Sequence, residues 1–371
     1  MSIDTNVMTT ETLRAMIERD EPLTILDVRP ADERAEWSIP GSLHVDAYER
    51  LKAGDRHVLD TVDLPTSQPV VTVCAAGRTS QIAADLLRER GMNAISLAGG
   101  MKSWSLAWNT ARVDVPGSAA LVIQLRRTGK GCLSYMVGSG GEALVIDASL
   151  DPDVYMQLAA EHDWTITTVL DTHVHADHLS RSRLLAERAG ATLYMPRQDR
   201  VHYPFQPLRD GDTLAVGEAT LRVIATPGHT NESTTYQLDG QALFTGDTLF
   251  LAGVGRPDLE ATADESRQRA ATLHDSLQRL LQLPPGSIVL PGHVSEPIPF
   301  DGQPLSAPLS SVRERVSLLH ETRDGFVSAI LGRIPPTPPN HHLIVEANEA
   351  GLLPDGDVTD LEAGANRCAV S

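Results

Sequence analysis

The 371-residue sequence predicts an α/β protein with more than one domain. Its length is sufficient for two or three domains, each with a hydrophobic core of its own. The first part of the chain alternates predicted strands and helices, a pattern typical of a small domain with a mostly parallel sheet. The second part repeatedly places His or Asp beside Gly where a predicted strand ends. These observations predict two α/β units with different chemistry.

The first domain is expected to span residues 1–112. Its first helix should begin at a Thr9 or Thr10 cap, and a later helix should end at Gly91. A linker over 113–119, rich in Pro, Gly and Ser, should follow the domain. The predicted strands are 23–27, 70–73 and 94–97, and the predicted helices are 9–19, 80–90 and 100–108.

The second domain is expected over 120–345. Its Pro-rich segment 333–342 should lie extended on the surface, and the polar residues 346–371 should form a mobile tail. Ser180 is a suitable cap for the helix that follows the densest His cluster. The predicted strands are 121–125, 132–137, 143–147, 165–170, 219–225, 241–245 and 287–290, and the predicted helices are 152–162, 180–188, 262–283 and 312–331.

The composition excludes several classes of protein. The formal net charge of -18 argues against a nucleic-acid or membrane-surface partner. No apolar run is long enough to span a bilayer, and the first residues lack the layout of a signal peptide. The three cysteines, Cys74, Cys132 and Cys368, have no paired spacing, which favours a reduced, cytoplasmic protein. Cys132 is expected in the core, and Cys368 is expected to be a thiol of the tail.

A cluster of metal-ligand side chains follows the predicted buried strand 165–170. It consists of His173, His175, Asp177 and His178. Alternate residues of an extended segment share a face, so the first three can point one way and His178 another. Imidazole and carboxylate together suit zinc or iron better than magnesium or calcium. The alternative, a chance group of surface histidines, does not account for the position of the cluster at the end of a strand.

Three later residues have the same local setting, a ligand-type side chain beside Gly at the end of a strand. Glycine lets the backbone turn tightly there, so that the neighbouring side chain can point inward. Any one of them alone would more often be a structural residue. The three are His229 after 219–225, Asp247 after 241–245 and His293 after 287–290.

Cys74 directly follows the predicted strand 70–73 and opens a loop that leads into a helix. The loop consists of Cys74, Ala75, Ala76, Gly77, Arg78 and Thr79. Backbone N–H groups of such a turn, the positive end of the helix and the Arg78 charge would stabilise a thiolate. The loop therefore predicts a nucleophilic cysteine, although a lone cysteine at a strand end is often only a small core residue.

The complete series of His and Asp residues resembles that of the metallo-β-lactamase superfamily. The resemblance implies an αββα sandwich with the metal at the mouth between two sheets. The superfamily includes zinc hydrolases and persulfide dioxygenases that use one iron, so the ligands alone do not name the reaction. The segment 253–258, Gly-Val-Gly-Arg-Pro-Asp, is similar to persulfide dioxygenases, which implies that Arg256 helps to hold the loop and the thiol substrate near the iron. A structural ion pair with Asp258 is an equally weighted alternative.

The first domain resembles the rhodanese family, whose members carry sulfane sulfur as a cysteine persulfide. Phosphatases with a related loop need Arg at its end, where Ser80 stands, so phosphatase activity is disfavoured. Ala75 and Thr79 replace Arg residues of many small rhodaneses, which bears on the preferred sulfur donor. The resemblance rests on 27–29 (Asp-Val-Arg), 39–42 (Ile-Pro-Gly-Ser), 74–79 and 99–101 (Gly-Gly-Met) together with Trp104.

Together these resemblances imply a persulfide dioxygenase with a fused rhodanese. His173, His229 and Asp247 would hold one Fe2+, with His175 beside them. Cys74 and Asp177 are the predicted catalytic side chains, and His178 and His293 would orient ligands and water. The substrate of the second domain would be a thiol persulfide such as glutathione persulfide. In the first domain, Cys74 would move sulfane sulfur between this thiol pool and sulfite or thiosulfate. Whether the chain forms a homodimer stays open.

Two other functions are compatible with the same residues. In a thioester hydrolase similar to glyoxalase II, Asp247 would bridge two Zn2+ ions. His173, His175 and His229 would bind the first ion, and Asp177, His178 and His293 would bind the second. Alternatively, the first domain would serve only as a docking or sulfide-sensing module, and Cys74 would report persulfide without turnover.

Overall fold

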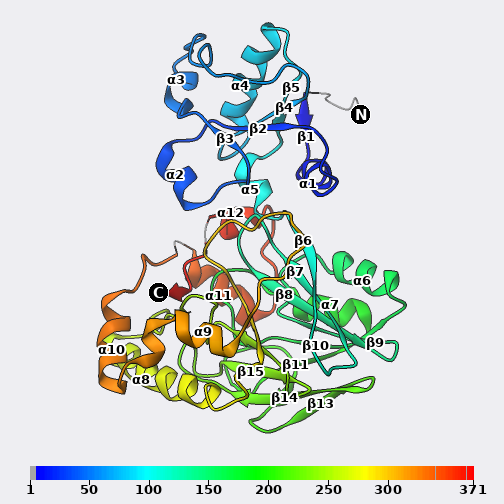
Figure 1. Ribbon diagram of the computed structural model, residues 1–371, viewed down its shortest axis with the longest axis vertical. Helices are drawn as coiled ribbons and strands as arrows, with labels where there is room; N and C mark the ends of the chain where they lie inside the picture. The colour runs from blue at the N-terminus through cyan, green and yellow to red at the C-terminus, as the bar shows by residue number, and fades with distance from the viewer. Residues whose placement is uncertain (1–5, 339, 365) are drawn as a thin grey trace.

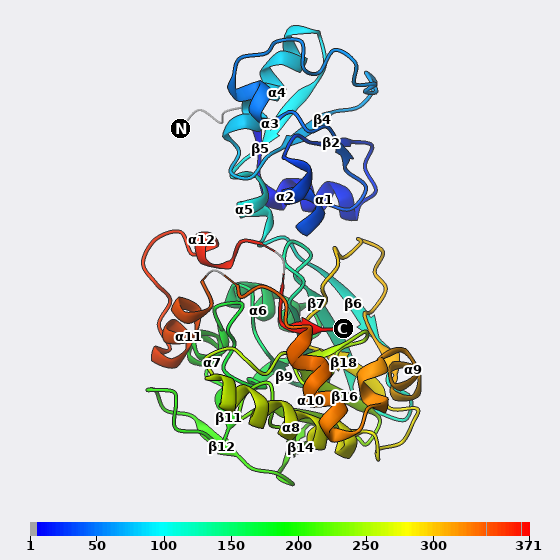
Figure 2. The same ribbon diagram turned by 90° about the vertical axis from the view of Figure 1, so that its left-hand side faces the viewer.

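The chain folds into two parts of unequal size that meet at a narrow waist (Figure 1). This computed structural model describes residues 6–338, 340–364 and 366–371. The smaller part contains a five-stranded sheet with its helices, and the larger part contains a seven-stranded, a six-stranded and a two-stranded sheet. Helix α5 (Gly100–Trp104) lies at the lower end of the smaller part, next to helix α12 (Thr359–Glu362) of the larger part, and a view turned by 90° agrees (Figure 2).

The first domain is a five-stranded sheet in which every adjacent pair of strands is parallel. Its strands are, in spatial order, β1 (Val7–Met8), β5 (Ala94–Leu97), β4 (Val70–Val73), β2 (Thr24–Asp27) and β3 (Leu43–His44). Its helices are α1 (Thr10–Glu18), α2 (Ala31–Glu36), α3 (Tyr48–Lys52), α4 (Arg78–Glu89) and α5 (Gly100–Trp104). The predicted strands and helices of this domain are confirmed within a few residues.

Apolar residues on both faces of β2 and β4 account for the layers of this domain. Side chains alternate along a strand, so successive residues serve opposite cores. Leu26 and Val70 pack with α3 and α4 on one face, whereas Ile25 and Val71 pack with α1 and α5 on the other. Cys74 comes directly after β4, at the carboxyl end of the sheet, where loops and helix starts gather.

The second domain contains two sheets packed face to face. The seven-stranded sheet has the order β12 (Gln206–Leu208), β11 (Thr192–Pro196), β10 (Thr165–Leu170), β9 (Glu142–Ile146), β8 (Leu133–Ser139), β7 (Leu121–Arg126) and β6 (Asn109–Val113). The six-stranded sheet has the order β13 (Thr213–Val216), β14 (Ala219–Ala225), β15 (Thr234–Leu238), β16 (Ala242–Gly246), β18 (Ile288–Pro291) and β19 (Ala307–Pro308).

Helices cover the outer faces of the two sheets. Helices α6 (Pro152–Glu161) and α7 (Ser182–Ala189) pack on the seven-stranded sheet. Helices α8 (Ala263–Leu280), α9 (Leu309–Arg315) and α10 (Arg323–Gly332) pack on the six-stranded sheet. A third core fills the space between the sheets, where Tyr135 of β8 meets Phe244 of β16 edge to face. The αββα sandwich predicted from the sequence is confirmed.

The predicted boundary between the domains is wrong. Strand β6 pairs with β7 in antiparallel register from Asn109 to Val113, so residues 109–112 belong to the second domain and not to the first. The strand also includes Val113, which the sequence placed in a linker. The segment Asn-Thr-Ala-Arg-Val has no apolar run that marks a strand, and only its pairing partner reveals its domain.

Two local predictions in the second domain are also wrong. The single helix expected over 312–331 is divided into α9, a short 3-10 helix at Ser317–His320 and α10, which begins at a Thr322 cap. Arg181, and not Ser180, stands at the cap position of α7, although the Ser180 hydroxyl group accepts from the N–H of Ser182, the first residue of the helix, at 3.2 Å and donates to Asp171 at 2.8 Å.

The expected mobile tail is instead a folded part of the second domain. Helix α11 (His341–Ala350) starts where the Pro-rich segment ends, and helix α12 (Thr359–Glu362) follows. Strand β20 (Ala369–Val370) pairs in antiparallel register with β17 (Val254–Gly255). We call residues 362–370, apart from the undescribed residue 365, the C-terminal strap.

Glu362 anchors the C-terminal strap in the interior. Its carboxylate is fully buried between the guanidinium groups of Arg127 and Arg181, at 3.1 and 2.6 Å, and accepts from the backbone N–H of Leu179 at 2.7 Å. Although burial alone would raise the pKa of Glu362, the charges of Arg127 and Arg181 hold it well below its ordinary value. The ionised carboxylate is thus part of the fold.

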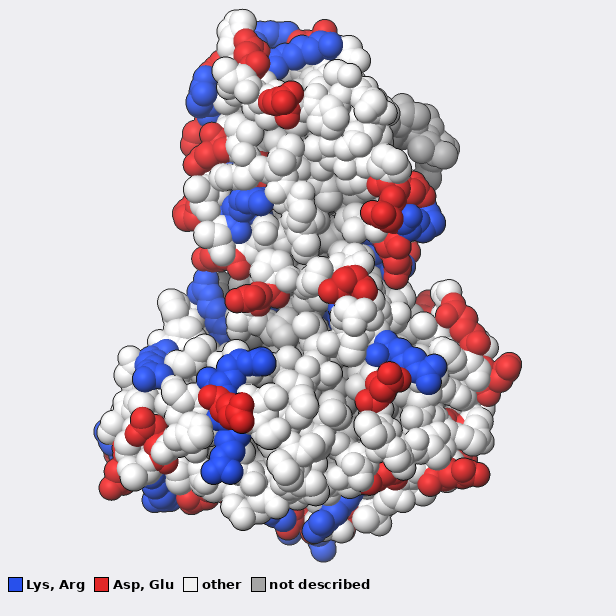
Figure 3. All heavy atoms as spheres, in the orientation of Figure 1, with Lys and Arg blue, Asp and Glu red and all other residues white. Residues whose placement is uncertain are grey.

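The outer surface carries acidic and basic side chains side by side. On the face shown in Figure 3 neither sign forms a continuous patch. Among the described residues, no helix is both long and apolar enough to cross a membrane.

Replacing Glu362 with Gln should lower the free energy of unfolding by about 3 kcal/mol, because two buried guanidinium groups would lose their counter-charge. Denaturant unfolding at pH 7 measures the loss, with Glu314→Gln at an exposed position as the control. The folded-state pKa of Glu362 is depressed, so its contribution is present above the ordinary value of 4.5 and fades as the pH falls below it. A variant as stable as the wild type at pH 7 would contradict this role of Glu362.

Candidate active sites

Two hydrogen-bond donors at the start of α4 point at the sulfur atom of Cys74. The backbone N–H of Gly77 donates to Cys74 Sγ at 3.2 Å, and the Ser80 hydroxyl group donates at 3.3 Å. Gly77 has a φ of +82° and lies so close to Gly99 that a Cβ would stand 2.8 Å from the Gly99 nitrogen. The turn therefore requires glycine, and its geometry suits an anionic sulfur.

The remaining loop residues divide between the wall of a cavity and the interior. Ala75, Ala76 and Arg78 line a cavity of about 380 Å³ together with Cys74, and Arg78 is exposed at the first position of α4. Thr79 is buried. The sequence analysis missed the role of Ser80, which was considered only as a replacement for a phosphatase Arg.

The second site lies where strands of both sheets end. His173 follows β10 and His229 follows β14, and each ring has one nitrogen already engaged. Thr172 Oγ1 lies 2.9 Å from His173 Nδ1, and His229 Nδ1 lies 2.7 Å from the carbonyl oxygen of Arg256. These contacts turn the Nε2 atoms of both rings toward the interior of the site, as in the outer hydrogen bonds of metal-binding histidines.

Asp247 completes a first group of ligand atoms. Its Oδ2 atom lies 3.9 Å from His173 Nε2 and 3.6 Å from His229 Nε2. Its Oδ1 atom lies 2.5 Å from His293 Nδ1. One carboxylate oxygen is therefore shared with His173 and His229, and the other is engaged by His293.

A second group of ligand atoms lies next to the first. It contains Asp177, His178 and His293 and also Cys132, all buried. Asp177 Oδ2 is 2.7 Å from His293 Nε2, and Asp177 Oδ1 is 3.1 Å from His178 Nδ1. Cys132 Sγ donates to Asp177 Oδ2 at 3.4 Å. Cys132 is buried as predicted, but the sequence did not reveal that it joins this group.

His175 belongs to a third group, with Asp147 and Asp171. Its Nε2 atom is 3.2 Å from Asp147 Oδ1, and its ring centroid is 4.2 Å from that of His173. The structure thus gathers all seven predicted ligand residues into one buried region, with His175 on the side of Asp147.

Burial and neighbouring charges set the protonation of the site. Burial, followed by the nearby His175, lowers the pKa of His173 well below its ordinary value, and burial also lowers that of His229. Burial would raise the pKa of Asp247, but the charge and hydrogen bond of His293 hold it below its ordinary value. The first group therefore offers two neutral imidazoles and one carboxylate, the forms that bind metal.

The second group has a different balance of charge. Burial disfavours the charged form of His178, yet Asp177 and Cys132 raise its pKa to about 10. Burial and Asp177 would raise the pKa of Cys132, but His178 and His293 outweigh them and lower it to about 6. Asp177 and Cys132 therefore lie beside two imidazoles, those of His178 and His293, whose pKa values are raised.

The side chains fit a metal ion on structural grounds. Several of their ligand atoms are buried and lack a hydrogen-bond partner within the described ranges, which is costly for polar groups unless something else binds them. These atoms include His173 Nε2, His175 Nδ1, His178 Nε2 and Asp247 Oδ2. Imidazole and carboxylate donors suit Fe2+ or Zn2+.

Two asparagines that the sequence analysis missed fix the metal-binding loop. Asn348 of α11 donates to the carbonyl oxygens of His175 and His178 at 2.8 and 2.9 Å. Asn366 of the C-terminal strap donates to Asp177 Oδ2 at 2.8 Å. Asparagine in a polar segment gives no signal in the sequence, because its partners are known only after folding.

Cys368 is also part of this region and not a thiol of a free tail. It is buried in the C-terminal strap, and burial together with the charges of Asp247 and Asp177 raises its pKa well above the ordinary value. A neutral thiol therefore lies beside the carboxylates of the metal site.

Arg256 lies in the interior, at the side of the C-terminal strap. Its guanidinium group is fully buried and makes two 2.8 Å contacts with the carboxylate of Asp258. It also donates to the carbonyl oxygens of Pro336 and Arg367. The structural ion pair with Asp258, the alternative weighed in the sequence, is the arrangement found here, and Arg256 holds the C-terminal strap.

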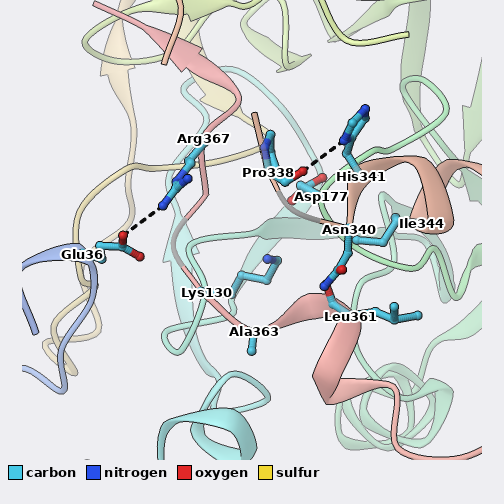
Figure 4. Close-up of a pocket in the computed structure, with 11 residues that line it drawn as sticks. Glu36, Lys130, Asp177, Pro338, Asn340, His341, Ile344, Leu361, Ala363 and Arg367 are labelled. Carbon is cyan, nitrogen blue, oxygen red and sulfur yellow. Dashed lines mark hydrogen bonds and ion pairs between the residues drawn. The ribbon is translucent and has the colours of Figure 1, made fainter. Parts of the chain in front are cut away.

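Two cavities reach the metal site from opposite sides of the strap. One of about 90 Å³ touches Asp177 and is lined by Glu36, Lys130 and Arg367 among others (Figure 4). The other, of about 360 Å³, touches His293 and is more apolar, with Phe250 and Ile298 in its wall. The chain therefore has two chemically distinct centres. One is the group of metal-ligand side chains in the αββα sandwich, and the other is the Cys74 loop of the first domain.

Comparison with known proteins identifies both domains. The model of the metallo-beta-lactamase superfamily matches residues 127–293, and the model of the rhodanese-like domain matches residues 9–107. The chain therefore consists of a rhodanese-like domain followed by a metallo-beta-lactamase superfamily domain. The hydroxyacylglutathione hydrolase of Brucella anthropi is 36% identical over 154 residues, which are 40% of this chain and 56% of that protein. The chain spans about half the length of such curated relatives.

Solved structures agree on the larger domain. The crystal structure of ETHE1 from Myxococcus xanthus has a TM-score of 0.54 and 33% identity, covering 62% of this chain and 97% of that chain. A metallo-beta-lactamase from Staphylococcus aureus has a TM-score of 0.58 and 27% identity, covering 64% of this chain and 74% of that chain.

Replacing Asn348 with Ala should weaken metal binding by about 10- to 100-fold, because the carbonyl groups of His175 and His178 would lose their shared donor. Competition with a chromophoric chelator measures the affinity for Fe2+ and Zn2+. Asn93→Ala, at an exposed position of the first domain, is the matched control. Equal affinities of the two variants would show that Asn348 does not position the loop.

Proposed function

We propose that the second domain is a persulfide dioxygenase and that the first domain is a rhodanese-type sulfurtransferase. The observation that carries the proposal is the group formed by His173, His229 and Asp247. Two histidines and one carboxylate are the ligand set of non-haem iron oxygenases, because they leave coordination positions for other molecules. The resemblance of segment 253–258 to persulfide dioxygenases and the rhodanese fusion support this choice over other reactions of the superfamily.

The overall reaction converts a thiol persulfide, O2 and water into the free thiol, sulfite and two protons. Fe2+ held by His173, His229 and Asp247 would supply redox activation of O2 and a position for the persulfide sulfur. Thr172 and the Arg256 carbonyl group keep the two imidazoles oriented. Burial would raise the pKa of Asp177, but His293 and His178 hold it well below its ordinary value, so an ionised carboxylate lines the cavity beside the metal site.

In the first domain, the Cys74 thiolate would attack the outer sulfur of a donor such as thiosulfate. A sulfur–sulfur bond to Cys74 forms, the sulfur–sulfur bond of thiosulfate breaks, and sulfite leaves with the electron pair. The Gly77 N–H and the Ser80 hydroxyl group stabilise the thiolate before the attack and after transfer to an acceptor. This chemistry fits a turning-over sulfurtransferase better than a module that only senses sulfide.

A thioester hydrolase is the second candidate, and the group around Asp177, His178 and His293 favours it. With His173, His175 and His229 nearby and Asp247 between them, these side chains could hold two Zn2+ ions. The hydroxyacylglutathione hydrolases among the relatives support the same alternative. Both candidates share the first group of ligands and differ in the reaction and in the metal.

Replacing Ser80 with Ala should reduce sulfur transfer from thiosulfate to cyanide by about tenfold, because the Cys74 thiolate loses a hydrogen bond. Thiocyanate formation measures the rate, with Ser67→Ala at an exposed position as the control. Cys74→Ser should abolish the reaction. Undiminished thiocyanate formation by Cys74→Ser would remove Cys74 from the mechanism.

Iron-loaded wild-type protein should consume O2 and form sulfite when glutathione persulfide is added, and His229→Ala should not. His229→Ala should retain thiosulfate:cyanide transfer, because Cys74 lies in the other domain. His342→Ala, an exposed histidine of α11, is the control for both assays. Absence of O2 uptake by the wild type, with cleavage of a glutathione thioester by the zinc-loaded protein, would assign the domain to the hydrolase.

A further inference from the structure

Three cavities follow one another from the Cys74 loop to the metal site. The cavity of about 380 Å³ at Cys74 shares Ala75 with a second cavity of about 250 Å³ at the waist of the molecule. The second shares Glu36, Ala363 and Gly364 with the third, of about 90 Å³, which reaches Asp177. Each cavity thus shares lining residues with the next, from the Cys74 loop to Asp177 of the metal-binding loop. We call the second and third cavities together the interdomain chamber.

The interdomain chamber is built from both domains. Glu36 and Trp37 come from the first domain, Gly129 and Lys130 from a loop of the second, and Ala363 from the C-terminal strap. Figure 4 shows Glu36 facing Arg367, with Lys130 and Asp177 on the side of the second domain. The volume of the chamber is comparable to the lower end of the usual range for small-molecule sites, about 300–1,000 Å³.

The frame of the chamber is fixed, because the contacts between the domains beside it are buried. Trp37, 3% exposed, donates its indole N–H to the carbonyl oxygen of Thr128 at 3.2 Å. Arg127 donates to the carbonyl oxygen of Ser105 at 2.7 Å. A Cβ on Gly129 would overlap the carbonyl group of Trp104, so the two backbones are in direct contact. The chamber is therefore a preformed space and not a gap between loosely joined domains.

The wall of the chamber carries charges of both signs. Arg367 pairs with Glu36 at 3.0 Å, and Lys102 pairs with Asp360. The acidic partner of each pair is more than half exposed, so these ion pairs are weak and can exchange for contacts with a ligand. Lys130 is buried and donates to the carbonyl oxygen of Glu362. Such a wall suits a small molecule that carries both carboxylate and ammonium groups.

We propose that the interdomain chamber binds a low-molecular-weight thiol of mixed charge, such as glutathione, and that the persulfide made from it at Cys74 reaches the metal site without leaving the protein. The proposal rests on the proposed function for its second half. Its first half, binding of the thiol in the chamber, depends only on the residues of the chamber wall.

The transfer step takes place where the cavity at Cys74 adjoins the interdomain chamber, and it is balanced. The thiolate of the bound thiol attacks the outer sulfur of the Cys74 persulfide, which carries the proton. A sulfur–sulfur bond to the small thiol forms, the bond to Cys74 breaks, and Cys74 leaves as a thiolate. No oxidant or reductant is consumed. The proton remains on the transferred sulfur, so the product is the persulfide that the metal site uses.

Binding is tested with S-methylglutathione, which has no free thiolate to bind a metal. Calorimetry on the full-length wild type should detect binding. Ala363→Phe, which fills the shared wall, and Lys102→Glu, which reverses a charge, should each weaken it at least tenfold. The matched controls, Ala53→Phe and Arg222→Glu at exposed positions away from the waist, should bind as the wild type does. Binding that is undetectable in the wild type, or equal in all variants, overturns the site.

Passage within one chain is tested by mixing two full-length variants. Cys74→Ser retains the metal site, and His229→Ala retains the sulfurtransferase. With thiosulfate and glutathione as substrates, O2 uptake by the wild type should exceed that of the mixture at least fivefold at equal site concentration. Equal rates overturn direct passage, because the persulfide then travels through solution. If the wild type takes up no O2 even with added glutathione persulfide, the proposed dioxygenase activity is wrong. The calorimetric experiment still tests whether the interdomain chamber binds the thiol.

Discussion

The buried carboxylate of Glu362 is the contact on which the arrangement of both sites depends. It lies between Arg127 and Arg181 and accepts from the backbone of Leu179, which directly follows the metal-binding loop. Arg127 also donates to Ser105 of the first domain. Three separate segments therefore meet at one charge cluster, and moving any of them would leave an unpaired charge in the interior.

Both centres are formed by polar groups at strand ends, but one offers hydrogen-bond donors and the other offers ligand atoms without a hydrogen-bond partner within the described residues. At Cys74, a glycine turn and a hydroxyl group offer hydrogen-bond donors to a sulfur atom. At the metal site, strand ends from two sheets offer acceptors that only a cation satisfies. Parallel strands bring their carboxyl ends to one edge, which explains why each centre lies where loops leave a sheet. The interdomain chamber lies between these two edges.

Much of this was predictable from the sequence. The strands before Cys74, His173 and His229 were placed correctly because apolar runs end sharply at glycine or at polar residues. The contributions of Glu362, Asn366 and Cys132 could not be predicted, because their partners lie far away in the chain. Arg127 is 235 positions from Glu362, and a polar segment that will be neutralised by distant arginines resembles one that stays in solvent. Strand β6 was not predicted, and its residues 109–112 were placed in the first domain, because pairing is a tertiary property.

The C-terminal strap gives the order in which the metal site is completed. Asn366 holds Asp177 across 189 positions of sequence, and β20 pairs with β17 behind the loop that orients His229. During synthesis the His and Asp side chains emerge first, and the residues that close the site emerge last. The metal-ligand side chains are therefore synthesised before the strap residues that hold Asp177 and the loop beside His229 in place.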